Sequence, residues 1–227
     1  MTFDIRPASA DDAPAIAALN NRIWPDLPTT PERVTKALTG NNRTCIVALA
    51  SDQVVGFVDG FINHDSQAAD WALRWEVDLV AVAPEAREHG LAARMIAASN
   101  ERGERAGASS ARAVVRVGNI GAERSFEVCG YTPSEPHQLM VAGPEPSQFI
   151  ALAVPFCWVF VETLTYKGLW VEPPYERLKD VRGLVRKENC ETIGLLVPED
   201  DFRQIEEARD LGFGAVNAYR LWTHKLG

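Results

Sequence analysis

One junction constrains the fold of this chain more than any other feature: an alternating strand that runs through a tight turn into a long helix. Between residues 71 and 82 every odd position is apolar, which predicts a strand with one face in the core. The even positions carry Arg74, Glu76 and Asp78 before both faces become apolar. Residues 90–105 then have the composition of a helix, so strand, turn and helix are expected in direct succession.

The turn in this junction has the residues of an anion-binding site. The first turn of a helix leaves backbone N–H groups unpaired, and its end of the helix dipole is positive. Gly90 lets the backbone approach a ligand, and Ala92 keeps side-chain bulk away from it. The turn therefore suits a phosphate or pyrophosphate. A purely structural interpretation stays open, because neither a Walker loop nor a GxGxxG pattern is present.

The residues before this junction predict a strand, two helices and a hairpin. Residues 3–7 alternate as a strand does, and Ser9 with Asp12 forms a capping-box pattern for a helix that ends at Trp24. A second helix begins after Thr30, with proline in its first turn. The β-rich runs 44–50 and 54–62 then predict a hairpin.

The residues after the junction predict a strand at 111–117, a helix at 122–129 that ends at Gly130, and a strand near 137–141. Residues 143–146 break regular structure and mark a boundary. The apolar run 149–161 is either a buried strand pair or a helix kinked at Pro155.

The end of the chain repeats parts of its beginning. Residues 169–174 resemble residues 80–85, and residues 209–213 resemble residues 127–131. The two matches keep their order along the chain, which indicates a second, partial copy of the same unit.

Composition excludes several classes of protein. The formal net charge is −8, whereas nonspecific nucleic-acid binding needs a basic surface. The longest apolar run is too short to span a bilayer, which needs about 20 residues, and the N-terminus lacks the basic and apolar stretches of a signal peptide. The four cysteines form no CxxC pair and the histidines show no ligand spacing, so neither a metal site nor a disulfide framework is expected. A cytoplasmic protein without nucleic-acid or membrane partners is predicted.

Two motifs together resemble the GNAT superfamily of N-acetyltransferases. The pattern R-x-x-G-x-A over residues 87–92, behind a strand and opening a long helix, resembles the acyl-CoA pyrophosphate loop of that family. The pattern N-x-x-A-x-x-S-F-E-x-x-G-Y over residues 119–131 is similar to its later motif. The order of elements from residue 3 to about 142 also resembles that fold, so the resemblance covers roughly the first 143 residues.

The resemblance implies an α+β fold, an α/β sandwich in which a mixed, mostly antiparallel twisted sheet is flanked by helices. It implies a GNAT-like acetyltransferase domain at residues 1–143 and a truncated, degenerate GNAT-like domain at residues 144–227. The positions of the second copy that match Arg87, Gly90, Ala92 and Asn119 carry Glu176, Lys179, Val181 and Asp201. No working cofactor site is therefore expected in the second copy.

The resemblance also implies acetyl-CoA as co-substrate, without a metal. Backbone groups near Ala81 and Val82 would bond the pantetheine arm as an added strand does. Asn119 and Phe126 match positions that line the other side of the cofactor. The residues whose backbone amides would hold the pyrophosphate are Arg87, Glu88, His89, Gly90, Leu91 and Ala92.

The reaction implied is direct attack of an amine on the thioester, which requires a base for the ammonium proton. Glu76, eleven residues before Arg87, resembles the catalytic glutamate of some relatives, and Asp78 is the reserve candidate. Both are equally consistent with solvent-facing residues of a half-exposed strand, and a bulge would change which face they occupy. Phe126 stands where many relatives carry a proton-donating tyrosine. The thiolate would therefore leave unaided, take a proton from water, or take a proton from another group such as Tyr131 or Cys129.

The function predicted is N-acetyltransfer from acetyl-CoA to the primary amine of a small molecule or peptide. The alternative is a catalytically weakened acyl-CoA-binding module with a regulatory or interaction role. The second copy would pack on the first sheet, mediate a homodimer, or close the acceptor side. Trp24, Trp71 and Trp75 are either core residues or walls of an acceptor pocket.

Overall fold

The computed structural model describes residues 2–40, 42–64, 72–143, 158–173, 175, 178 and 190–227. The helices longer than one turn whose bounds lie within these residues are α1 (Ala13–Ile23), α2 (Pro31–Leu38), α3 (Leu91–Arg105), α4 (Ile120–Val128) and α6 (Phe202–Asp210). The strands are β1 (Asp4–Pro7), β2 (Arg43–Ala50), β3 (Gln53–His64), β4 (Leu73–Val82), β5 (Ser110–Arg116), β6 (Thr132–Pro133), β7 (His137–Ala142), β8 (Trp158–Glu162), β9 (Lys167–Val171), β10 (Thr192–Pro198) and β11 (Gly214–Lys225).

The first two helices begin at the caps that the sequence predicts. The backbone N–H of Ser9 donates to Oδ2 of Asp12 at 2.7 Å, and α1 follows after a short 3₁₀ turn. Oγ1 of Thr30 accepts from the backbone N–H of Arg33 at 3.2 Å at the start of α2. Capping depends on a few neighbouring residues, which is why these boundaries can be predicted locally.

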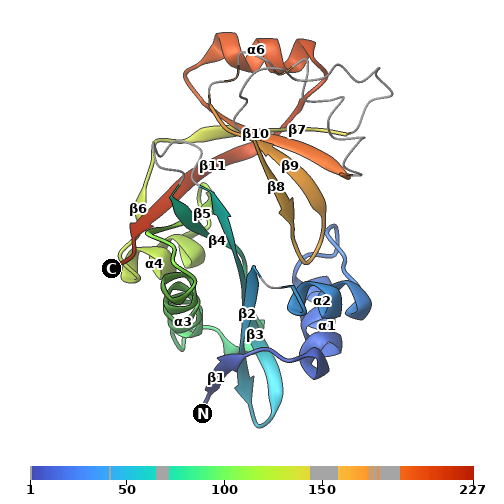
Figure 1. The fold of residues 1–227 in the computed structure, drawn as a ribbon, viewed down its shortest axis with the longest axis vertical. Helices are drawn as coiled ribbons and strands as arrows, with labels where there is room; N and C mark the ends of the chain where they lie inside the picture. Colours follow the sequence, from blue (N-terminus) through green and yellow to red (C-terminus); the bar gives the residue numbers. More distant parts are fainter. Residues whose placement is uncertain are drawn as a thin grey trace.

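The described strands join in one mixed, mostly antiparallel sheet, ordered β1-β2-β3-β4-β5-β11-β7-β10-β9-β8, with β6 paired to β11. In the first half, α3 and α4 lie on one side of this sheet and α1 and α2 on the other (Figure 1). The fold class predicted from the resemblance is confirmed.

The two halves of the chain exchange their last strands. β11 pairs antiparallel with β5 of the first half, and β7 pairs antiparallel with β10 of the second half. β7 and β11 also pair with each other, so they form the centre of a sheet to which both halves contribute. The second half therefore continues the first sheet. The boundary expected at residues 143–146 lies almost wholly outside the described residues.

The second half repeats the architecture of the first in the parts that are described. β9 and β10 are parallel, as β4 and β5 are, and α6 follows β10 as α4 follows β5. Asp201 caps α6 by accepting from the N–H of Gln204 at 3.0 Å, as Asn119 caps α4 by accepting from the N–H of Ala122 at 3.4 Å. The partial second copy is confirmed.

Parts of three sequence predictions lie outside the described residues. Of the ambiguous run 149–161, only residues 158–161 are described, and they belong to β8, which pairs antiparallel with β9. Glu176, Lys179 and Val181 fall within the undescribed part, as does Trp71.

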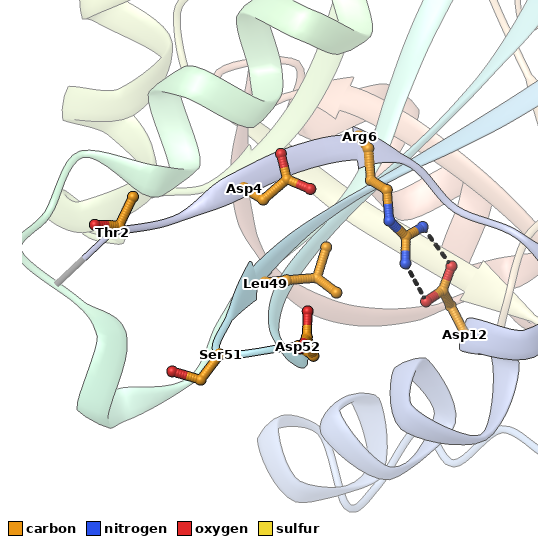
Figure 2. A pocket seen from close by; sticks show the side chains of 7 residues that line it. All are labelled: Thr2, Asp4, Arg6, Asp12, Leu49, Ser51 and Asp52. Atoms are coloured by element: carbon orange, nitrogen blue, oxygen red, sulfur yellow. Dashed lines mark hydrogen bonds and ion pairs between the residues drawn. The ribbon is translucent and has the colours of Figure 1, made fainter.

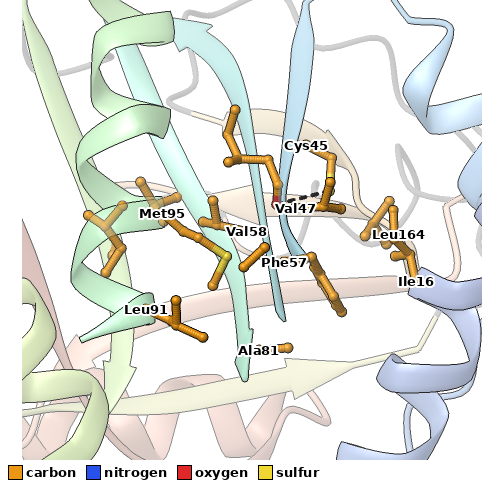
Figure 3. Packing of buried hydrophobic residues seen from close by; sticks show 14 of the residues in the cluster. Ile16, Cys45, Val47, Phe57, Val58, Ala81, Leu91, Met95 and Leu164 are labelled. Carbon is orange, nitrogen blue, oxygen red and sulfur yellow. Dashed lines mark hydrogen bonds between the residues drawn. The ribbon is translucent and has the colours of Figure 1, made fainter. Parts of the chain in front are cut away.

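The core of the first half lies on both faces of β2 and β3. Leu91 and Met95 of α3 cover one face, and Ile16 of α1 covers the other together with Leu164 (Figure 3). Leu164 belongs to the second half, so the two halves share this core. A second cluster surrounds Met140 and Ile193 beneath the later strands.

Candidate functional site

The turn between β4 and α3 has an open, left-handed backbone. Gly90 has a φ of 67°, and a Cβ placed on it would meet no atom within 4 Å. Glu88 also has a φ of 67°, which is unusual for a residue with a side chain. The first N–H groups of α3 have no intrahelical carbonyl partner, and turns of this kind bind anions. These features fit the pyrophosphate of a CoA thioester.

Two side chains fix the shape of this turn. Nε of Arg87 donates to the carbonyl of Val82 at 3.2 Å, which ties the turn to the end of β4. Nδ1 of His89 lies 2.7 Å from the carbonyl oxygen of Arg87, and its ring contacts Phe3 edge to face. The residues from Arg87 to Gly90 are exposed, whereas Leu91 is buried in the core.

β4 has an unpaired edge directly before this turn. Its parallel pairing with β5 runs from Arg74↔Ser110 to Val77↔Ala113 and ends there, although β4 continues to Val82. Among the described strands, the last part of β4, with Ala81 and Val82, therefore has no neighbour on the β5 side. An extended ligand can pair with such an edge as an added strand does.

The residues from the second motif have structural roles in α4. Asn119 is exposed and caps the helix. Phe126 is 3% exposed, and its ring packs 5.0 Å from Tyr131 and 6.3 Å from Trp222. The hydroxyl of Tyr131 donates to Oδ1 of Asn100 at 2.7 Å, and burial raises the pKa of this phenol well above its usual value.

A cavity of about 680 Å³ lies beside the middle of β4. Glu76, Val77 and Asp78 line it from β4. Residues of β3, β5, β7, β8, β9, β10 and β11 and of the segments 26–28, 165–166 and 172–173, together with Tyr175, also line it. Most of the residues that line this cavity therefore belong to the second half.

Glu76 is held in a buried ion-pair network. Its Oε1 accepts from Nε of Arg74 at 2.8 Å and from Nη2 of Arg112 at 2.9 Å, and its Oε2 accepts from Nε of Arg112 at 3.0 Å. Both guanidinium groups also lie 2.7 Å from Oε1 of Glu172, which the second half supplies. The negative charges of the two glutamates and the positive charges of the two arginines therefore cancel within the network.

Asp78 lies in a bulge. Asp59 pairs with Leu79 and Gly60 with Val77, so Asp78 has no partner on β3. Its Oδ2 is buried without a hydrogen-bond partner in the described part of the chain. Burial, reinforced by the negative charges of Asp59 and Glu76 and opposed by Arg43, raises the pKa of Asp78 to about 7.

Behind it, Asp59 is fully buried. Its Oδ2 lies 3.1 Å from Nη1 of Arg43, but the two atoms do not meet hydrogen-bond geometry. Burial raises the pKa of Asp59 to about 6, although Arg43 and the backbone N–H of Gly60 oppose this change.

The structure brings the two predicted carboxylates into one cavity but places Trp24 and Trp75 elsewhere. Trp75 is 1% exposed in the core and donates to Ser99, and Trp24 packs edge to face against Phe57. The aromatic walls come instead from Trp170 and Tyr166, which sequence reasoning missed. The repeat at residues 169–174 was the available signal, but it indicated decay rather than a contribution to the first site.

A second hollow of about 340 Å³ lies near the N-terminus. Arg6 donates to both carboxylate oxygens of Asp12 at 2.8 Å (Figure 2). These hydrogen bonds lower the pKa of Asp12 to about 2, and none of the residues lining this hollow belongs to β4. The ion pair between Arg6 and Asp12 therefore has a structural role next to the start of α1.

The described residues show neither a metal-binding cluster nor a membrane-spanning helix. They hold no group of three or more His, Cys, Asp or Glu side chains placed to bind a metal ion. Nor does any helix among them have the length and apolar composition needed to cross a bilayer.

The acetyltransferase (GNAT) family profile matches residues 13–131, more than half of the chain. The chain belongs to the GNAT family. No curated protein matches this GNAT protein in sequence.

Solved structures share the GNAT fold at low sequence identity. A tandem GNAT protein from the clavulanic acid biosynthesis pathway is 15% identical, with a TM-score of 0.58, and the match covers 100% of this chain and 99% of the other. A GCN5-related N-acetyltransferase from Sphaerobacter thermophilus is 15% identical, with a TM-score of 0.59 and coverage of 99% and 96%. NAA60 of Arabidopsis thaliana, in complex with acetyl-CoA, is 16% identical, with a TM-score of 0.52 and coverage of 60% and 90%.

Proposed function

We propose that this GNAT protein transfers an acetyl group from acetyl-CoA to a primary amine bound in the 680 Å³ cavity. One observation carries the proposal: β4 parts from β5 after Val77, and Asp78 lines the cavity at that point. The unpaired edge that suits a pantetheine arm therefore begins where the acceptor cavity has its carboxylates.

The chain offers a continuous set of groups for acetyl-CoA, which supplies the activated acetyl thioester. The edge at Ala81 and Val82 would pair with the pantetheine arm. The backbone amides of residues 87–92 would hold the pyrophosphate at the positive end of α3. Asn119 and Phe126 are assigned to the cofactor by resemblance alone.

The proton of the acceptor ammonium must leave before the amine nitrogen bonds to the acetyl carbon and the CoA thiolate departs. Asp78 is supported as the group that takes this proton, because burial raises its pKa to about 7. A base works best when its pKa lies near the working pH. Glu76, the base favoured by sequence spacing, would have to release guanidinium hydrogen bonds to take a proton. We therefore propose Asp78 as general base and Glu76 as the residue that fixes Arg112.

The leaving thiolate has no evident acid among the predicted groups. Phe126 has no proton to give, and Tyr131 is 3% exposed with its hydroxyl bound to Asn100. The thiol of Cys129 donates to the carbonyl of Ala93 at 3.2 Å. We propose that the thiolate leaves without a protein acid, or with a proton from water.

Two measurements test the proposal. Calorimetry should detect acetyl-CoA binding, and CoA release should depend on an added amine. Asp78→Asn should lower kcat by about 10²–10⁴-fold with acetyl-CoA affinity unchanged. A full rate in Asp78→Asn together with a large loss in Glu76→Gln would return the base role to Glu76. Tight binding of acetyl-CoA without release for any amine would favour the regulatory module instead.

We also propose a cytoplasmic location, which the free thiols of Cys45, Cys129 and Cys190 support. The homodimer named as one role of the second half stays a prediction, and sedimentation can test it.

A further inference from the structure

The walls of the cavity beside β4 are mostly apolar. They include Val114 of β5, Leu139 of β7, Val161 of β8, Leu196 of β10 and Leu221 of β11, and the indole of Trp170 lines the same space. A cavity of about 680 Å³ is within the usual size range of sites for small organic molecules.

Most polar side chains of this cavity already bind other protein groups. Nε1 of Trp170 donates to the hydroxyl of Tyr166 at 3.0 Å, and the hydroxyl of Tyr175 donates to the carbonyl of Leu196. Nδ1 of His137 lies 2.8 Å from the carbonyl oxygen of Glu135. A ligand with many hydroxyl or amino groups would therefore find few free partners here, and burying such groups unpaired is unfavourable.

The charged groups leave one place for a buried cation. Glu76, Glu172 and Arg112 neutralise one another with Arg74. At the rim, Asp26 is exposed, and Glu191 is paired with Arg33 at 2.8 Å. Within the described residues, Asp78 is the inner carboxylate that has a buried oxygen without a hydrogen-bond partner.

We propose that the acceptor is a monoamine with a bulky apolar body, whose ammonium group meets Asp78 and whose body fills the space lined by Leu139, Val161 and Trp170. This inference deepens the proposed function and rests on it for the chemistry, but not for the binding. The ammonium gives one proton to Asp78, and the nitrogen lone pair then bonds to the acetyl carbon as the carbon–sulfur bond of the thioester breaks. The second proton that the nitrogen loses passes through water to the departing CoA thiolate. Polyamines and amino sugars fit this cavity poorly, because their additional polar groups would lie against aliphatic walls.

The first test compares apolar and polar amines of similar size. We expect kcat/KM for octylamine and 4-phenylbutylamine to exceed that for spermidine, glucosamine and glycylglycine by at least about 100-fold. Equal or greater kcat/KM for any of the polar amines would overturn the inference while leaving the acetyltransferase proposal intact.

A binding measurement decides the inference even if no amine is acetylated. With CoA present in place of acetyl-CoA, no transfer can occur, and calorimetry reports binding alone. Octylamine and 4-phenylbutylamine should bind at least about 10-fold more tightly than spermidine. Absence of this preference would overturn the inference, whereas the preference without turnover would overturn only the proposed function.

A charge placed in the wall tests the location. Val216 of β11 lines the cavity and is 46% exposed, so a lysine there is compatible with folding. Val216→Lys should lower kcat/KM for 4-phenylbutylamine by at least about 10-fold and leave the KM for acetyl-CoA unchanged. The control Phe202→Lys changes an exposed apolar residue of α6 that does not line the cavity, and it should have no effect. Equal effects of the two variants would place the amine elsewhere.

Discussion

Asp78 is the residue at which folding and the proposed catalysis have opposite requirements. The bulge places its carboxyl group among buried apolar walls and beside Asp59, which makes the charged form costly. A carboxylate with a pKa near 7 is a stronger base than an ordinary carboxylate and is still partly ionised at neutral pH, which suits a general base for an amine. The same environment makes the native state less stable once the group is ionised.

The first prediction at this scale concerns the pH dependence of the rate. Because the base must be ionised, kcat/KM should rise as pH increases through about 7 and then level off until another group titrates. Initial rates of CoA release between pH 5 and 9 measure the profile. An inflection near pH 4.5 would identify a carboxylate in ordinary surroundings as the base.

The second prediction concerns stability. A raised pKa means that the native state holds a proton that the unfolded chain has lost, so Asp78 destabilises the fold increasingly as pH rises from about 4 to 7. Asp78→Asn removes this charge and should raise Tm at pH 8 by about 5 °C, with little change at pH 4. Calorimetric melts at both values measure the difference, and an equal shift at both would show that charge burial is not its cause.

At the scale of elements, β4 and α3 approach more closely than ordinary side chains allow. The indole of Trp75 lies beneath Gly103 of α3, where an added Cβ would come within 2.6 Å of the ring. A Cβ added to Gly60 of β3 would likewise come within 2.6 Å of the same ring. Glycine is required at these two positions because a buried ring occupies the space of a side chain.

A pair of alanine variants tests this packing. Gly103→Ala should lower the free energy of unfolding by about 1–3 kcal/mol through overpacking, despite the better helix propensity of alanine. Gly121→Ala in α4 meets no atom within 4 Å and should be neutral or stabilising by up to about 1 kcal/mol. Urea unfolding measures both, and a stabilised Gly103→Ala would show that Trp75 moves aside freely.

Elements that depend on neighbouring residues could be predicted from the sequence, and pairings between distant ones could not. The caps of α1 and α2, the alternation of β4 and the start of α3 are local, and the structure has them where expected. The insertion of β11 between β5 and β7 depends on pairs as far apart in sequence as Gly214 and Val141 or Lys225 and Ser110, which no local pattern specifies. The network around Glu76 was missed for the same reason, because Glu172 joins it from the second half.

At the scale of the whole molecule, ion pairs of two kinds join the halves. Glu172, 5% exposed, binds the guanidinium groups of Arg74 and Arg112, whereas Glu162 binds Lys36 with both side chains more than half exposed. Removing one charge from a buried network leaves others unbalanced, but an exposed pair contributes little.

These two glutamates form a matched comparison. Glu172→Gln should lower the free energy of unfolding by about 3–5 kcal/mol, and Glu162→Gln by less than about 1 kcal/mol. Urea unfolding of both variants measures the ratio. Similar small losses would mean that the buried network does not hold the halves together.

The strand exchange makes a final prediction about residues 1–143, which the sequence presents as a complete acetyltransferase domain. Without the second half, β5 loses β11, and β7 loses both β10 and β11. Leu164 also leaves the core that it shares with Ile16. Unpaired strand edges and an opened core favour aggregation.

A chain that ends at residue 143 should therefore be aggregated or lack a cooperative thermal transition, as size-exclusion chromatography and circular dichroism would show. A monomeric fragment that melts cooperatively and binds acetyl-CoA would show instead that β7 can take the place of β11 beside β5.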